Sequence, residues 1–340
     1  MKANFRSYAW AVLIFHLAVV VWGAFVRASD SGAGCGEHWP LCNGQVVPKA
    51  PLPATMIEFG HRVTSGLAFV SVLVLFIWAW SVFKKGHAVR RAALLAMMST
   101  VVECLIGAAL VLLHLVKANA SLSHGLWLSA HLVNTLLLLA ALSSTAWLAT
   151  TIDRPSVRYQ KLAWSRLAVG LSIAAFLTAA VLGGFAAVGD SLATSRSLFE
   201  SIRADFSPFS NIFVRLRILH PIVAGGVAIY LLVIALRVSA SLTTAIVKRF
   251  SATIGALVIL QCSVGIANIA LKTPTWLQLL HLLAADLLWI ALVLFTLELL
   301  PSVRRVRANN FAGLRIDHEK NHSAVSQSPT KLLNRISYRT

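Results

Sequence analysis

Eight long apolar runs constrain the fold of this chain more than any other feature. A helix that crosses a bilayer core needs about 20 apolar residues. Runs of that kind occupy residues 9–27, 59–83, 92–115, 123–149, 162–188, 215–238, 251–271 and 277–299. Only 12% of the residues are charged and 58% are hydrophobic, which is too little charge to cover the surface of a soluble protein. The sequence therefore predicts an all-α integral membrane protein with eight transmembrane helices in a lipid bilayer.

The connections between the runs predict the orientation of the chain. Lys and Arg gather before the first run and in every second connection, near residues 84–91, 154–161, 248–249 and 304–307. The loops 28–57 and 189–213 are longer or poorer in them. Since basic loops stay in the cytoplasm, we expect both termini to be cytoplasmic. The net charge of +18 comes from these short clusters rather than from one basic face, so we expect no nucleic-acid partner.

The sequence also contains an internal repeat. Four groups of residues recur in the same order at offsets of 149 to 160 residues. They are Glu103-Cys104-x-Ile106-Gly107 with Gln261-Cys262-x-Val264-Gly265, Gly23-x-Phe25 with Gly183-x-Phe185, His61 and Gly66 with His220 and Gly225, and Trp127 and His131 with Trp276 and His281. We therefore expect two repeated four-helix bundles, residues 1–150 and 151–300, followed by a basic polar cytoplasmic tail, residues 301–340.

Four histidines occupy equivalent places in the two predicted halves. His61 and His220 lie near the outer ends of the second and sixth spans, and His131 and His281 near the outer ends of the fourth and eighth. An ionisable residue in a bilayer is costly and usually faces the bundle interior. A helical bundle holds a b-type haem by placing an imidazole from each of two facing helices on the iron. Each half is therefore predicted to bind haem.

Two further histidines lack counterparts in the repeat. His114 and His124 are therefore explained most simply by hydrogen bonds at a helix interface. His124 is nevertheless close enough in sequence to His131 to replace it as a candidate ligand. Two acids within apolar runs, Glu103 and Asp286, could be proton-linked or only hydrogen-bonded.

Glu58 breaks the symmetry of the two halves. It lies three residues before His61, on the same helical face, and its counterpart in the second half is Arg217. One interpretation is a solvated carboxylate at a helix N-terminus, which the helix dipole favours. The other is a functional group that serves only the first half. The neighbouring Arg62 could extend to the membrane interface or meet a haem propionate.

Cys35 and Cys42 lie in the loop 28–57, on the predicted outer side. Three interpretations fit their spacing. The pair could form a structural disulfide, it could be a labile disulfide that exchanges with a partner, or it could bind zinc together with His38.

At these residues the chain resembles the haem A synthase family. The resemblance extends over about residues 20–295 and rests on these segments: Gly34-Cys35 through Trp39-Pro40-Leu41-Cys42-x-Gly44 with Pro48; Glu58-x-x-His61-Arg62; Ala130-His131-Leu132; Leu219-His220-Pro221; and Gln278-Leu279-Leu280-His281 through Ala285-Asp286-Leu287-Leu288-Trp289.

The resemblance implies an enzyme that converts haem O to haem A, by oxidising a ring methyl group to a formyl group, for cytochrome oxidase assembly. It implies that His220 and His281 hold a resident haem b as cofactor. It also implies that His61 and His131 are ligands of the substrate haem, haem O or its product haem A, with Glu58 as the catalytic residue.

The resemblance further implies that Cys35 and Cys42 form a disulfide that helps substrate delivery or maturation. Unlike some members of the family, the chain has no second cysteine pair in the loop 189–213. The location it implies is the inner membrane of a bacterial cell. Haem O synthase and cytochrome oxidase assembly factors are the implied candidate partners, and a homo-oligomer is a candidate state.

Two alternatives compete with this hypothesis. A dihaem b-type electron-transfer protein explains the four histidines equally well, but it explains neither Glu58 nor the paired cysteines. A transporter with parallel repeats would place its binding residues near mid-membrane, whereas these histidines are expected at one face.

Overall fold

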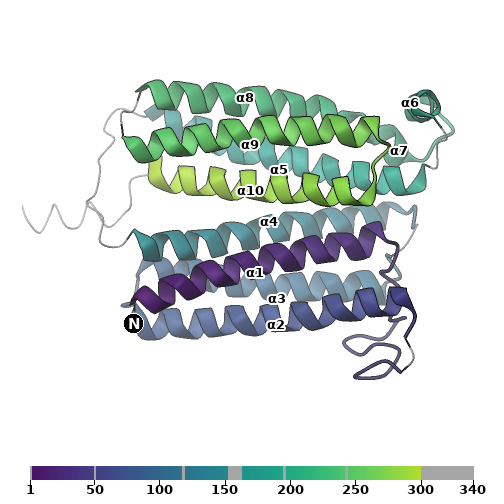
Figure 1. The fold of residues 1–340 in the computed structure, drawn as a ribbon, viewed down its shortest axis with the longest axis horizontal. Coiled ribbons are helices and arrows are strands. Elements are labelled where there is room, and N and C mark those ends of the chain that lie inside the picture. Colours follow the sequence, from purple (N-terminus) through teal and green to yellow (C-terminus); the bar gives the residue numbers. More distant parts are fainter. Residues whose placement is uncertain are drawn as a thin grey trace, which may run out of the picture. The chain divides into compact units, whose positions relative to one another are not determined.

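In the computed structural model of the chain, the described residues are 2–49, 51–116, 119–151, 163–193, 197–241 and 244–299. Within these ranges the chain forms helices joined by loops, with no β-strand (Figure 1). The basic cluster near residues 154–161 and the tail 301–340 lie outside them. The predicted all-α fold is confirmed.

Eight helical segments are long and apolar enough to cross a membrane, as predicted. Seven are single helices: α1 (Lys2–Ala28), α2 (Pro53–Val82), α3 (Ala88–Leu112), α4 (Leu122–Thr150), α5 (Ala163–Leu192), α9 (Ala245–Ala270) and α10 (Thr275–Leu299). Large apolar side chains remain exposed on them, for example Ile77, which is 58% exposed. In water such surfaces would be unfavourable, and in a bilayer they face lipid. The protein is thus a multi-pass membrane protein.

The remaining span is divided into two helices, which the sequence did not predict. The apolar run 215–238 corresponds to α7 (Ile212–Leu216) followed by α8 (Leu219–Ser241). Pro221 explains the break, because it has no N–H to donate to the carbonyl of Arg217 and its ring crowds that group. Asn211 caps the start of α7 by accepting a hydrogen bond from the Phe213 N–H. The preceding loop also contains a short unpredicted helix, α6 (Leu198–Phe206), capped by Ser197.

The first four helices pack in a closed arrangement. Helix α1 packs against α2 and α4, and α3 packs against the same two helices. The side chains between α1 and α2 are apolar and closely fitted, since Phe5 meets both Trp78 and Phe83 edge to face. Phe5 is fully buried, which fixes the register of these two helices.

Among the last four spans, α8 makes the most extensive contacts. Helix α8 contacts α5 and α9, and Trp289 of α10 stacks on Phe176 of α5. The two groups of helices meet where α4 packs on α5. There the indole of Trp289 donates a hydrogen bond to the Leu136 carbonyl of α4. That the two groups are repeats of one ancestral bundle stays a prediction.

Candidate haem sites and the disulfide loop

The second-half histidines face each other across the interior. His220 is the second residue of α8, and His281 lies on α10. Their ring centres are 6.2 Å apart and their planes are nearly perpendicular, at 87°. An imidazole nitrogen bonds a transition metal at about 2 Å, so two imidazoles on opposite sides of one ion have ring centres about 6 Å apart. The observed separation fits an iron between the rings.

The hydrogen bonding of His220 leaves the correct nitrogen free for such a role. Its Nδ1 lies 3.0 Å from the carbonyl oxygen of Ala179, to which it donates. The lone pair is then on Nε2, as in most metal-ligating histidines, whose other nitrogen is held by a carbonyl or carboxylate. His281 differs, because its Nδ1 is buried without a hydrogen-bond partner among the described residues. Its Nε2 lies 3.2 Å from the amide nitrogen of Gln261.

Glycines on neighbouring helices make room for three of the four rings. A Cβ added at Gly183 would lie 3.0 Å from Cε1 of His220, and one at Gly265 would lie 3.2 Å from Cε1 of His281. In the first half, a Cβ at Gly23 would lie 2.8 Å from Cε1 of His61. These distances are shorter than normal carbon contacts, so a larger residue would displace the imidazoles. Gly23 and Gly183 match in the sequence repeat, and their contacts match as well.

The first-half histidines also come from two different helices. His61 on α2 and His131 on α4 are close enough to interact electrostatically. The Nδ1 atoms of both rings are buried and accept or donate no hydrogen bond among the described residues. Unsatisfied buried nitrogens are costly unless a ligand uses the ring. This pair, from two different helices, could therefore hold a second haem.

A carboxylate on α3 faces the ring of His131. Glu103 Oε1 lies 3.5 Å from Nδ1 of His131. The same carboxylate accepts hydrogen bonds from Thr135 and Asn134 on α4, and Asn134 also donates to the Ser99 carbonyl. Sequence reasoning singled out Glu103 but missed Asn134 and Thr135. Their positions three and four residues after His131 could have indicated a shared face.

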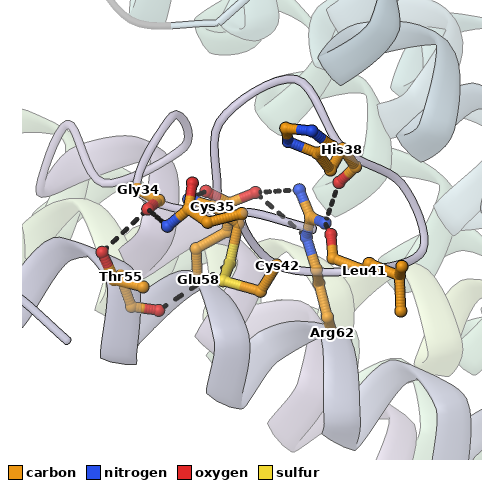
Figure 2. Close-up of polar contacts among 9 residues, drawn as sticks. Gly34, Cys35, His38, Leu41, Cys42, Thr55, Glu58 and Arg62 are labelled. Carbon is orange, nitrogen blue, oxygen red and sulfur yellow. Dashed lines mark hydrogen bonds and ion pairs between the residues drawn. A yellow bond between two sulfur atoms is a disulfide. The ribbon is translucent and has the colours of Figure 1, made fainter. Parts of the chain in front are cut away.

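Glu58 and Arg62 connect α2 to the loop that precedes it (Figure 2). Glu58 Oε2 accepts a hydrogen bond of 2.8 Å from the backbone N–H of Cys35. Its other oxygen accepts from Arg62 Nε and Nη2, at 3.1 and 2.6 Å. Arg62 Nη1 then donates to the carbonyls of His38 and Leu41, both at 2.6 Å. The Glu58 side chain is only 5% exposed, so neither oxygen is solvated as one interpretation supposed.

Cys35 and Cys42 form a disulfide, and both are buried. Bonded sulfurs are not the thiolates that zinc requires, so the disulfide replaces the zinc hypothesis. Within the described ranges no group of three or more His, Cys, Asp or Glu side chains is placed to hold a metal ion. Thr55 adds to the attachment of this loop by donating to the Gly34 carbonyl at 2.8 Å.

The other titratable candidates have different surroundings. His124 Nδ1 contacts the Asn119 carbonyl at 2.6 Å, beside the cap of α4, so it stabilises a helix start. His114 is largely exposed and lies 3.4 Å from Glu37. Asp286 is completely buried, with no hydrogen-bond partner for either oxygen among the described residues.

Arg217, the counterpart of Glu58, also attaches a loop. Its guanidinium bonds Asp190 at the end of α5, and Asp205 and Ser201 of α6. The charge is thus reversed between Glu58 and Arg217. Each of these side chains nevertheless bonds the loop that precedes a histidine-bearing helix.

One arginine joins the two halves. Arg27 of α1 donates to Gln278 Oε1 of α10 at 3.0 Å and approaches the Ala187 carbonyl of α5 at 3.5 Å. Sequence reasoning missed this contact, because residues 251 positions apart in the chain give no local signal.

Taken together, these features define a class: an eight-span helical membrane protein with two pairs of interior histidines and a disulfide-closed loop. The chain matches the model of the COX15-CtaA family, described as cytochrome oxidase assembly protein, over residues 6–53 and 51–293. The chain belongs to this family.

Individual relatives agree with this assignment. A protohaem IX farnesyltransferase from Thermus thermophilus is 42% identical over 291 residues, which are 86% of this chain and 48% of that protein. A haem A synthase from Lysinibacillus sphaericus is 42% identical over 109 residues, 32% of this chain and 35% of that protein. One from Geobacillus kaustophilus is 41% identical over 111 residues, 33% of this chain and 35% of that protein. The chain thus spans less than half the length of each of these relatives.

Proposed function

We propose that the protein is a haem A synthase, which oxidises a ring methyl group of haem O to the formyl group of haem A. The observation that carries the proposal is the presence of two interior histidine pairs. In one of them, the ring centres of His220 and His281 are 6.2 Å apart. Two imidazoles alone suit an iron whose other ligands come from a porphyrin. The family match, and the relatives named haem A synthase, support the haem O substrate.

The two pairs receive different roles in this proposal. His220 and His281 would hold a resident haem b, which supplies one-electron redox chemistry when bound. His61 and His131 would bind the iron of the substrate and orient its ring. The apolar helix surfaces around them suit a farnesylated porphyrin.

Glu58 is the first-half residue proposed to be essential for conversion. Its contacts support a specific way of acting. It holds the disulfide loop through the Cys35 N–H and aligns Arg62. It also lies one helical turn from His61, so it orders the outer edge of the substrate site.

A haem O synthase is the proposed supplier of substrate. The Thermus thermophilus relative is named for farnesylation of protohaem IX, and this chain matches 48% of it. Farnesylation of protohaem would produce the farnesylated haem that this chain would consume. The Thermus thermophilus protein therefore joins a segment similar to this chain to a protein named for the reaction that would supply its substrate. Assembly factors of cytochrome oxidase and a second copy of this chain are further proposed partners. Affinity purification from detergent-solubilised membranes tests this proposal. Recovery of none of these partners would refute it.

We also propose a bacterial inner-membrane location with cytoplasmic termini. The basic connection of residues 84–91 supports this orientation, because positive loops stay inside. Alkaline phosphatase fused after Lys49 should be active and fused after Lys85 inactive. The reverse pattern would refute the orientation.

Haem extraction and mass analysis test the proposed function. The protein is purified after co-expression with a source of haem O, and its pigments are identified. Haem A, or a hydroxylated haem O, beside haem B is expected. Haem B alone despite available haem O would indicate the dihaem cytochrome, and no haem would leave the histidine pairs without their proposed ligand.

A further inference from the structure

Helices α3 and α9 place different groups against the histidines of α4 and α10. In the first half Glu103 Oε1 lies 3.5 Å from Nδ1 of His131. In the second half the amide nitrogen of Gln261 lies 3.2 Å from Nε2 of His281. Glu103 and Gln261 are equivalent in the sequence repeat, 158 residues apart. The halves thus differ at the histidine Nδ1: a carboxylate faces that of His131, whereas that of His281 has no hydrogen-bond partner among the described residues.

The carboxylate of Glu103 is held in its place by neighbouring side chains. Thr135 donates to Oε1, the oxygen that faces His131, and Asn134 donates to Oε2. Thr135 is anchored in turn, because its hydroxyl also lies 2.9 Å from the His131 carbonyl. The donors and the histidine they serve belong to the same stretch of α4. A carboxylate fixed by two donors costs little additional ordering when it acts on a third group.

We propose that Glu103 is the positioning residue for His131 and sets the ligand strength of the first-half haem site apart from that of the second half. The inference rests on the proposed function, since it concerns haem bound through His131. At 3.5 Å the contact is slightly longer than a hydrogen bond, and a small rotation of the imidazole would close it. With Nδ1 turned toward Glu103, Nε2 would be the nitrogen left free to bind a haem iron.

The chemical consequence follows from the charge. A carboxylate on the distal nitrogen of a metal-ligating imidazole fixes its tautomer and increases its donor strength, and removing such a group typically lowers metal affinity about 10- to 100-fold. Stronger donation and nearby negative charge stabilise the ferric form, so they lower the reduction potential. His281 has no such carboxylate, because its Nδ1 lacks a hydrogen-bond partner among the described residues and its neighbour Gln261 is neutral. Two sites with the same ligands therefore acquire different properties.

Glu103→Gln removes the negative charge beside Nδ1 of His131, and Gln261→Glu places a negative charge beside His281. The matched control is Glu298→Gln, since Glu298 is also an interior carboxylate and accepts a hydrogen bond from Trp147 at 2.9 Å, far along α10 from His281. Each variant is purified with its resident haem and titrated with haem O without oxygen, so that conversion does not occur. The readouts are the dissociation constant of haem O and the reduction potential of each haem.

We expect Glu103→Gln to weaken haem O binding about 10-fold or more and to raise the potential of the first-half haem alone. Gln261→Glu should lower the potential of the second-half haem, and Glu298→Gln should move neither. Unchanged affinity and potential in Glu103→Gln would overturn the proposal, as would equal shifts in the Glu298→Gln control.

Two further outcomes separate this proposal from the proposed function. If the wild type binds and converts haem O but Glu103→Gln behaves identically, only the role of Glu103 is refuted. If the wild type binds no haem O, the proposed function and this inference fall together. Glu103→Asp serves if the Gln variant does not fold, because it keeps the charge but withdraws the carboxylate by one methylene. Glu103→Asp should also raise the reduction potential of the first-half haem.

Discussion

At the scale of single residues, the two histidine pairs differ in what surrounds them rather than in what they are. His220 has its tautomer set by the Ala179 carbonyl, and His131 faces the carboxylate of Glu103. Glu58, close to His61 in sequence, is directed to the disulfide loop instead. Residues that share a predicted site therefore divide into groups that would contact haem and groups that hold the surrounding structure in place.

This division predicts which substitutions remove the resident haem. His220→Ala or His281→Ala should strip haem b from the purified protein, because each removes one of the two side chains proposed to hold it. Glu58→Gln should keep haem b and lose most of the conversion of haem O. The pyridine haemochrome spectrum and product analysis measure the two effects separately. Loss of haem b in Glu58→Gln would contradict the separation of roles.

The glycine beside His220 is a second test at this scale. Gly183→Ala places a Cβ 3.0 Å from the imidazole Cε1, so we expect the ring to shift, a destabilisation of about 1–3 kcal/mol and reduced haem b content. Gly170→Ala on the same helix is the control, since a Cβ there meets nothing within 4 Å. Thermal unfolding in detergent and the haem-to-protein ratio measure both. Equal behaviour of the two variants would show that the close approach has no consequence.

At the scale of elements, two loops are attached near a histidine-bearing helix by buried charged side chains. Glu58 with Arg62 holds the loop of the Cys35–Cys42 disulfide onto α2. Arg217 holds α6 against the segment before α8. These attachments add polar contacts to the apolar helix packing near His61 and His220.

The attachment of the disulfide loop predicts how readily its sulfurs are reached. Arg62→Met removes the bonds to Glu58, His38 and Leu41, and hydrogen bonds to charged groups contribute about 1.5–3 kcal/mol each. The loop should open more often, so dithiothreitol should reduce the disulfide about 10-fold faster or more, measured by alkylation and mass analysis. Arg91→Met, an exposed site on α3, is the control. An unchanged reduction rate in Arg62→Met would mean that the network does not restrain the loop.

At the scale of the whole molecule, the two groups of four spans meet through α4, α5, α1 and α10. Trp289 bonds the Leu136 carbonyl and fills the space beside Phe176. Arg27 crosses from α1 to Gln278, three residues before His281. The junction between the halves is thus connected to the proposed resident site by less than one turn of α10.

Arg27→Met tests this junction. It leaves Gln278 Oε1 without its charged donor, which should cost about 1.5–3 kcal/mol, lower the unfolding temperature in detergent, and reduce haem b occupancy through displacement of α10. Arg6→Met, at the other end of the same helix, should have a much smaller effect on both readouts. If Arg27→Met unfolds at the wild-type temperature with full haem b, the junction does not depend on this arginine.

The sequence by itself determined the class of the protein, its spans and its paired histidines. Apolar length and the repeat of His61 and His131 as His220 and His281 are local or periodic features, so they can be read without a fold. The tertiary structure decided the rest. It showed that Pro221 divides a span, that Glu58 bonds the Cys35 N–H, and that Glu103 faces His131. These outcomes depend on which helix faces which, and an apolar bilayer accepts many such arrangements until packing and buried hydrogen bonds select one.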